Sequence, residues 1–497
     1  MNFTNKFSIA VIWNYLNKTT GYLLDFILSV VLARGLGEYY YGVYTELWNF
    51  VFLFSLFSSA GIDTAITVFL PKVAENAHHI SCYLRMTFKF FGVVVLVIML
   101  LLMLTGGYLS RTVHSPELSA LLKIVAFYIA FYSFILIAQA ILLSFYETRF
   151  LFWVNTILKS SVILCSYLIL KNGGSLEYVI WSMIGINMIT AGIYLFRIYP
   201  LFRVKPEVQS LSPFFKFGFI AWITSFINYL LGRYFDIFLL GVFSIPKANI
   251  GYYNIAFSLT LAMAAIITSG FSGITTAAFA QFEHQNKRQV IAEGWLKVTK
   301  LCIFISIPLF LFVILNSRIL ISAVYGEAYV QSANLLQLFA FLYLISLGLG
   351  SGTNSALLYS INKEKIVLKI RAVCGLVNVL LDIILIPIWG VKGAILASGS
   401  AIVLTIGAEF LFSRKNANLK FPARFVFKIS LAAVISLVVS HLLPAQSLLE
   451  LLVTLVIYII FFIFCLFLLK PFVKDEVISL SNLDVRAGRL LNFFSEE

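Results

Sequence analysis

Residues 9–46 read IAVIWNYLNKTTGYLLDFILSVVLARGLGEYYYGVYTE, an apolar run that three polar residues interrupt before a glycine-rich turn. These three residues are Asn14, Lys18 and Asp25. At about 100° per residue they fall within roughly 40° of one another on an α-helix, so the helix has one polar stripe. Such a stripe should not face lipid, because charged groups are costly in the hydrocarbon. The stretch therefore predicts a membrane helix whose polar side faces protein or water.

A second copy of this pattern occurs near the middle of the chain. There an apolar run is interrupted by Asn228, Arg233 and Asp236. After each polar stripe the chain restarts with a similar tetrapeptide, GVYT at 42–45 and GYYN at 251–254. A pattern that recurs along a chain indicates a repeated structural unit. We therefore predict that one helical unit is used twice.

The composition is typical of an integral membrane protein. The 497 residues are 61% hydrophobic and 12% charged, with a mean hydropathy of +0.97, whereas soluble domains carry about 25% charged residues. Runs of about 20 apolar residues, long enough to cross a bilayer, recur from end to end. We predict an all-α polytopic membrane protein with about 14 transmembrane helices, at roughly 9–33, 42–70, 90–110, 118–145, 150–170, 178–196, 214–241, 251–280, 301–316, 331–360, 366–388, 393–412, 425–443 and 448–469.

These spans divide into six, six and two. The predicted domains are an N-terminal six-helix lobe over residues 1–205, a C-terminal six-helix lobe over 206–415, two additional transmembrane helices over 416–470 and a cytoplasmic tail over 471–497. The longest polar stretches are too short to fold alone, so we expect no attached soluble domain. Any function should reside in the helices.

Loop charge predicts the orientation in the membrane. Loops after even-numbered spans carry about three times as many Lys and Arg residues as loops after odd-numbered spans, and basic loops stay on the cytoplasmic side. Both termini are therefore expected in the cytoplasm. A basic inner face against anionic lipids also accounts for most of the net charge of +14, without any nucleic-acid partner.

The candidate binding residues are polar groups that lie deep in the predicted spans. A charge at the middle of the bilayer costs about 2.5 to 3.5 kcal/mol on insertion scales, so each one needs a partner or a water-filled cavity. We predict a hydrated cavity with two sets of residues. The substrate-binding set is Lys18, Arg233, Lys159, Asn14 and Asn228, and the coupling-ion candidates are Asp25, Asp63 and Asp236.

The same groups also have a structural interpretation. Lys18 with Asp25, and Arg233 with Asp236, could neutralise each other locally and support helix packing. Both interpretations stay open on the sequence alone.

Several other polar residues are interpreted as structural. The hydroxyl stripe of Ser269, Ser272 and Thr276 is typical of close helix packing rather than of ligand contacts. Glu46 and Glu409 lie near predicted span ends, where a carboxylate can reach water, and we assign them no role.

Enzyme signatures are mostly missing, so we predict that the chain is not an enzyme and has no catalytic residue or metal site. No G-x-x-x-x-G-K-[ST] and no D-x-D occurs, so neither the phosphate loop of an ATPase nor paired carboxylates for a sugar-nucleotide transferase can be placed. The pair His78-His79 makes a poor metal site without further ligands nearby. The five cysteines have no C-x-x-C spacing and are interpreted as packing residues.

Five short motifs resemble a known family. They are LARGLG at 32–37, YGVY at 41–44, SAGIDTA at 59–65, RYFD at 233–236 and IGYY at 250–253. This pattern resembles the polysaccharide-export (Wzx-type) lipid-linked oligosaccharide flippases of the multidrug/oligosaccharidyl-lipid/polysaccharide exporter superfamily. The resemblance implies two six-helix lobes that form a V around a central cavity, with the first, second, seventh and eighth spans at its border.

The resemblance also implies a function. Such a protein flips an undecaprenyl-diphosphate-linked oligosaccharide, an O-antigen or other surface polysaccharide repeat unit, from the inner to the outer leaflet by alternating access. This places it in lipopolysaccharide or capsule biosynthesis, in the bacterial cytoplasmic (inner) membrane. Lys18 and Arg233 would hold the diphosphate or acidic sugars. No cofactor is expected, and a coupling ion, if the cycle uses one, would be a proton or Na⁺.

The expected partners are the lipid-linked oligosaccharide, membrane lipids, a glycan polymerase and other polysaccharide assembly proteins. The alternatives are a cation-coupled multidrug exporter and a peptidoglycan lipid-precursor flippase of the same superfamily. A membrane glycan polymerase ranks below both, because the predicted outward loops are too short to surround a catalytic centre.

Overall fold

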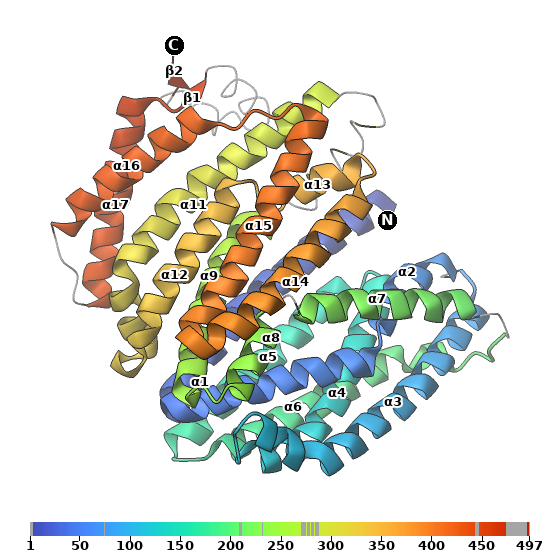
Figure 1. The fold of residues 1–497 in the computed structure, drawn as a ribbon. Coiled ribbons are helices and arrows are strands. Elements are labelled where there is room, and N and C mark those ends of the chain that lie inside the picture. Colours follow the sequence, from blue (N-terminus) through green and yellow to red (C-terminus); the bar gives the residue numbers. More distant parts are fainter. Residues whose placement is uncertain are drawn as a thin grey trace. The chain divides into compact units, whose positions relative to one another are not determined.

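Helices form almost all of the described part of the chain. The computed structural model describes residues 3–73, 75–207, 211–230, 232–269, 275, 279, 283, 288–442, 447–473 and 495–496 (Figure 1). In addition to the helices, the two-residue strands β1 (Phe472–Val473) and β2 (Ser495–Glu496) pair in parallel. The predicted all-α fold is confirmed.

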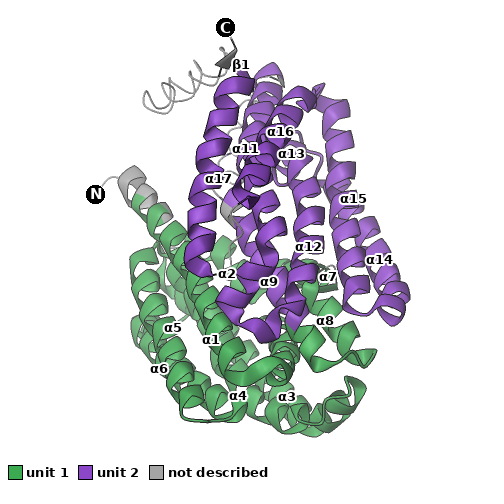
Figure 2. Cartoon of the chain, turned by 90° about the vertical axis from the view of Figure 1, so that its left-hand side faces the viewer, with its two compact units in different colours: residues 1–251 green, residues 252–497 purple. Residues whose placement is uncertain are grey.

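The chain divides into two compact units, residues 1–251 and 252–497 (Figure 2). Unit 1 holds α1 (Phe3–Ser59), α2 (Ile62–Phe69), α3 (Ala77–Thr112), α4 (Leu118–Ser144), α5 (Thr148–Lys171), α6 (Leu176–Ile198), α7 (Ser212–Leu230), α8 (Arg233–Val242) and the first turn of α9 (Lys247–Ser269). Short 3₁₀ turns follow α2 at Pro71–Val73 and α6 at Tyr199–Phe202.

Unit 2 continues α9 and then runs through the remaining helices. These are α11 (Arg288–Tyr325), α12 (Gln331–Gly348), α13 (Thr353–Ser360), α14 (Glu364–Trp389), α15 (Val391–Ala417), α16 (Ala423–His441) and α17 (Leu448–Leu469), with a 3₁₀ turn at Glu327–Tyr329. Within the unit, α11 packs on α12, α14 on α15, and α16 on α17.

Helix α1 carries two of the predicted spans. It is 57 residues long, and its backbone leaves the helical region at Gly37, where φ is 73° and ψ is 172°. Glycine adopts this conformation without the steric cost that a side chain adds. The chain therefore forms two legs, before and after Gly37, which Figure 1 shows meeting beside the α1 label. The turn predicted from the LARGLG motif lies where the sequence places it.

Two predicted spans of unit 1 are broken rather than continuous. The second span breaks at Ala60 and Gly61, which have φ values of 45° and 71°, so that α2 follows α1 as a separate helix. The seventh span bends by 56° between α7 and α8. In unit 2 the tenth span breaks between α12 and α13, at Gly350 and Gly352. Apolar periodicity alone did not predict these breaks.

The spans confirm a multi-pass membrane protein. By length and composition, eleven of the described helices could cross a membrane, and the bent pair of α7 and α8 makes twelve. Two of the fourteen predicted spans lie on the two legs of α1, and the predicted eighth span begins at α9. The end of the predicted eighth span lies largely outside the described residues, as does most of the predicted tail 471–497.

The compact units divide at Gly251, so α7 and α8 belong to unit 1, where they pack on α1 and α2. The lobe boundaries predicted at residues 205 and 415 stay a prediction.

Candidate functional site

One polar contact between two spans of unit 1 joins α1 to α5, which pack along one another. Lys159 Nζ donates to Asp25 Oδ1 at 2.6 Å, and it also lies 3.4 Å from the carbonyl oxygen of Gly21. The exposed fractions of the two side chains are 42% for Lys159 and 58% for Asp25. Both residues lie near the middle of their predicted spans. A half-exposed ion pair at that depth requires water beside it, because lipid would not solvate the charges.

A neutral hydrogen-bond network lies one turn away on α5. Asn155 Nδ2 donates to Asn17 Oδ1 of α1 at 3.2 Å. Its own Oδ1 accepts from Gln139 Nε2 of α4 at 3.0 Å and from the Tyr194 hydroxyl of α6 at 2.6 Å. This network ties four helices together and fixes the position of α5 next to the first leg of α1.

Lys18 and Asn14 lie on the same leg of α1 as Asp25. Lys18 is exposed and Asn14 is half-buried. Among the described residues, the ion-pair partner of Asp25 is Lys159, not Lys18. The local Lys18–Asp25 pair considered from the sequence is therefore not the one that forms. Lys18 is left as an exposed cation about two turns along α1 from Asp25.

The second polar stripe lies at the break between α7 and α8. Arg233 begins α8, and its Nη2 donates to the Tyr234 hydroxyl at 3.1 Å. The Tyr234 ring stacks on Phe52 of α1 with centroids 3.9 Å apart. Asp236 is fully buried one turn further along α8, whereas Asn228 is exposed near the end of α7. Arg233 is thus held against an aromatic surface in unit 1.

The third carboxylate predicted to bind a coupling ion, Asp63, lies in the first turn of α2. It is half-buried. The positive end of a helix dipole favours a carboxylate at that position, so its placement also has a purely structural explanation. All eight predicted site residues belong to unit 1, and two of them, Asp25 and Lys159, form an ion pair there.

Sequence reasoning missed a buried ion pair at the start of α9. Lys247 Nζ donates to Glu46 Oε1 at 2.7 Å and to the carbonyl oxygen of Val113 at 2.8 Å. The side chains are only 7% and 2% exposed, respectively. A Cβ on Gly42 would lie 1.8 Å from the Lys247 carbonyl oxygen, so glycine is required for this close approach. The prediction that Glu46 reaches water is wrong.

Glu409 of unit 2 is also buried. Its Oε1 accepts from Arg371 Nε at 3.3 Å, across the contact between α14 and α15. Sequence position near a span end indicated access to water for both glutamates, but the partners are supplied by other helices. The only local signal for the first pair is the glycine repeated at positions 42 and 251, which marks a close backbone approach.

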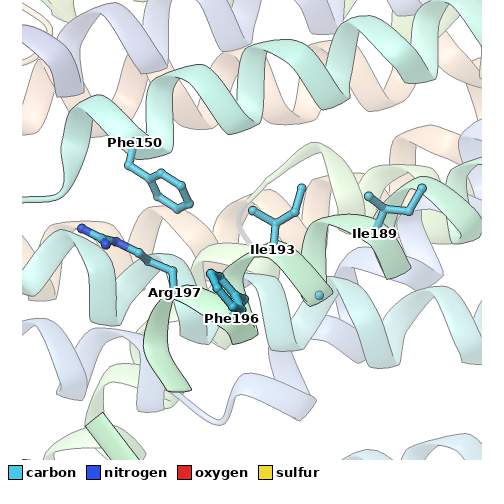
Figure 3. A pocket seen from close by; sticks show the side chains of 6 residues that line it. Phe150, Ile189, Ile193, Phe196 and Arg197 are labelled. Atoms are coloured by element: carbon cyan, nitrogen blue, oxygen red, sulfur yellow. The ribbon is translucent and has the colours of Figure 1, made fainter. Parts of the chain in front are cut away.

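The described residues also show an apolar pocket of about 550 Å³ between α5 and α6. Figure 3 shows Phe150, Ile189, Ile193 and Phe196 around it, with Arg197 at one side. Arg197 is already paired with Glu147 at 2.7 Å. None of the predicted site residues lines this pocket. Of the predicted hydroxyl stripe, Ser272, Thr276 and the side chain of Ser269 lie outside what the structure describes.

Comparison with known proteins identifies the family. A family model described as "Polysaccharide biosynthesis protein" matches residues 31–334. A stretch of 134 residues is 28% identical to the teichuronic acid biosynthesis protein TuaB of Bacillus subtilis (strain 168), and the match spans 27% of each chain.

Two solved structures show the fold. The chain is similar to the lipid II flippase MurJ in an inward closed conformation, with 20% identity and a TM-score of 0.70 over 90% of this chain and 98% of that one. It is also similar to an inward-facing multidrug resistance MATE family transporter of the MOP superfamily, with 12% identity and a TM-score of 0.68 over 82% of this chain and 98% of that one. The resemblance proposed from five short motifs is confirmed. The chain therefore belongs to the polysaccharide biosynthesis protein family, and it is a multi-pass membrane protein with the fold of the MOP-superfamily transporters.

Proposed function

We propose that this transporter flips an undecaprenyl-diphosphate-linked oligosaccharide from the inner to the outer leaflet of the bacterial inner membrane by alternating access. This proposal rests mainly on the half-exposed ion pair of Asp25 and Lys159, which lies near the middle of two predicted spans. Such a pair indicates that this side of unit 1 borders water within the membrane. A hydrated surface with cations suits a polar, anionic headgroup, while the lipid chain stays in the bilayer.

The proposed substrate-binding residues are Lys18, Arg233, Lys159, Asn14 and Asn228. Lys18 is exposed and therefore accessible to a phosphate, and Arg233 offers the planar, bidentate geometry that suits a diphosphate. The two asparagines can donate to and accept from sugar hydroxyls.

Lys159 has a more specific proposed role, because it is already bound to a carboxylate. A diphosphate arriving at Lys159 must compete with Asp25 for the same ammonium group. Binding of a proton or Na⁺ at Asp25 would weaken the pair and release Lys159 toward the substrate. Asp25 is therefore our first candidate for a coupling-ion site, ahead of Asp63 and Asp236.

The alternatives differ in cargo rather than in fold. A cation-coupled multidrug exporter would favour acidic over basic cavity residues, whereas Lys18 and Lys159 are both accessible here. A peptidoglycan lipid-precursor flippase would bind its cargo through the same chemistry. A gene deletion distinguishes the two functions, because cells that lose a peptidoglycan precursor flippase stop growing. The polysaccharide family match favours the surface-glycan cargo. A membrane glycan polymerase is the least supported, since both solved neighbours are transporters.

An accessibility assay for the lipid-linked glycan on each leaflet tests this function. Cells that lack the protein should keep the glycan on the inner leaflet, where an impermeant lectin cannot reach it. Normal outer-leaflet labelling in such cells would contradict the proposal. The polymerase alternative predicts altered glycan chain length with unchanged labelling. We further propose that both termini are cytoplasmic, and that a glycan polymerase and other assembly proteins act on the product.

A further inference from the structure

A second pocket in unit 1, of about 810 Å³, lies between α3 and α7 and is separate from the predicted site residues. The end of the second leg of α1 and the start of α2 form its back through Phe57, Ala60 and Ile62. The lining is apolar except for one lysine, Lys89 of α3. This lining is mostly apolar, whereas the surface around Asp25 and Lys159 is charged, so the pocket and that surface suit different ligands.

One face of α3 forms the first wall. Met86, Lys89, Phe90 and Val93 all line the pocket, at spacings of three and four residues that place them on one side of the helix. Phe90 is 39% exposed and Val93 is 66% exposed. Such an exposed apolar face on a membrane helix suits contact with lipid chains.

The second wall is one face of α7, which carries Phe215, Phe219 and Trp222. Helix α7 packs on α2, as Figure 1 shows. At the helix break, a Cβ on Gly61 would lie 2.1 Å from the Gly218 carbonyl oxygen, so the two backbones are in direct contact. This contact holds α7 in place.

The two walls are close together near Lys89. There the Phe90 and Phe215 rings are in contact, with centroids 5.5 Å apart. The pocket therefore lies between helices that already contact one another, and a ligand does not have to create it.

The polarity of the pocket matches that of a lipid standing in one leaflet. Lys89 directly precedes the predicted third span, at the depth of the headgroups, and Phe90, Val93 and Val94 follow it into the hydrocarbon. A lysine at this depth attracts a lipid phosphate, and the apolar walls below it suit an acyl chain. Because a single cation lines the pocket, charge complementarity favours one negative charge, a phosphodiester, over a diphosphate.

We propose that the α3–α7 pocket binds one anionic phospholipid of the cytoplasmic leaflet, with its phosphate at Lys89 and an acyl chain between Val93 and Phe219. The lipid fills the space between two helices that are in contact near Lys89, and it supports the broken second span from the bilayer side. This site is independent of the proposed cargo.

Tryptophan quenching tests the proposal, because Trp222 lines the pocket. The full-length protein is reconstituted in vesicles that contain a fixed mole fraction of either dibrominated phosphatidylglycerol or dibrominated phosphatidylcholine. The Trp222 contribution is the part of the quenching that is lost in Trp222→Phe. We expect a preference for the anionic lipid of about fivefold in this contribution, the size of effect that one lysine near the surface supplies.

Matched variants locate the site. Lys89→Gln should abolish the difference in quenching between the two lipids. Lys369→Gln should keep it, because Lys369 is also an exposed lysine at the predicted start of a span but does not line this pocket. Val93→Phe should reduce quenching by both lipids, and Val97→Phe, one turn further along α3, should not.

Three results would overturn the proposal. The first is equal quenching by the two lipids in the unmodified protein, and the second is an unchanged preference in Lys89→Gln. The third is displacement of the brominated lipid by undecaprenyl phosphate more effectively than by unlabelled phosphatidylglycerol, which would make the pocket a polyprenyl site.

Discussion

At the scale of single residues, the partner of Asp25 determines how the first polar stripe is interpreted. Asp25 lies seven residues after Lys18 on the same helix, but its ammonium partner is Lys159 of another helix. Helical periodicity predicted the polar stripe of α1, and the position of Lys159 deep in a predicted span marked it as a candidate. Periodicity could not predict which helix faces which, because that depends on packing between segments separated by more than 100 residues.

Exchanging the charges of Asp25 and Lys159 tests whether the two residues do more than neutralise each other. Lys159→Gln should lower export by about 10- to 100-fold, because a hydrogen bond to a charged group contributes about 1.5 to 3 kcal/mol. The double variant Asp25→Lys with Lys159→Asp should keep a normal membrane level, since it restores the pair, but should not restore export. Immunoblots of membranes beside surface-glycan labelling measure both quantities. Lys123→Gln, at an exposed lysine of α4, serves as the control. Full export by the exchanged pair would show that the two charges only neutralise each other.

Lys18 and Arg233 give a second prediction at this scale. Each single substitution to alanine should abolish or strongly reduce export while the protein level stays close to normal. Lys18 is exposed, so its loss strands no buried charge. If Arg233 were only a packing partner of the buried Asp236, the protein itself should disappear from the membrane, because breaking a buried pair costs about 3 to 5 kcal/mol. Normal export by both variants would end their proposed role in binding.

At the scale of helices, the Glu46–Lys247 pair connects the second leg of α1 to the first residue of α9. The two residues are 201 positions apart, so no local pattern could reveal the pair. The turn at Gly37 was predictable, because glycine-rich motifs signal local backbone conformation. The breaks at Gly61 and between α7 and α8 were not, because their flanking residues read as continuous apolar spans.

This pair should be a major support of unit 1. Glu46→Gln or Lys247→Gln should destabilise the protein by about 3 to 5 kcal/mol, because each leaves a buried partner uncompensated. The double variant should recover part of the loss. Glu147→Gln is the matched control, since it breaks the exposed pair with Arg197 and should cost about 0 to 1 kcal/mol. Thermal unfolding in detergent measures the three effects. Equal stability of Glu46→Gln and Glu147→Gln would contradict the structural role.

At the scale of the whole molecule, the number of spans and the loop charges predict the topology. In a background without the native cysteines, Asn172→Cys should react with an impermeant thiol reagent in intact cells, and Lys363→Cys should not. Both positions are exposed next to helix ends. Labelling at position 363 without labelling at position 172 would show that the orientation is the reverse of the predicted one.

Composition was enough to predict a polytopic helical membrane protein, because a 61% hydrophobic chain with recurring long apolar runs has few other ways to fold. Five short motifs were enough to indicate the family. The cargo is harder to predict, because fold and family are shared by proteins that move different molecules. The cargo depends on which chemical groups the exposed charges of the proposed substrate-binding residues bind.

Transport in reconstituted proteoliposomes tests whether this protein flips a lipid-linked oligosaccharide with the help of Lys18, Lys159 and Arg233. Lipid-linked oligosaccharide is placed in one leaflet, and its arrival in the other is followed with an impermeant glycan-oxidising reagent, with and without proton and Na⁺ gradients. We predict translocation by the unmodified protein and by Lys123→Ala, and none above protein-free vesicles by the triple variant Lys18→Ala, Lys159→Ala and Arg233→Ala. Indifference to both gradients would refute only the coupling role of Asp25. Equal translocation by the triple variant and the unmodified protein would show that these three cations do not bind the cargo.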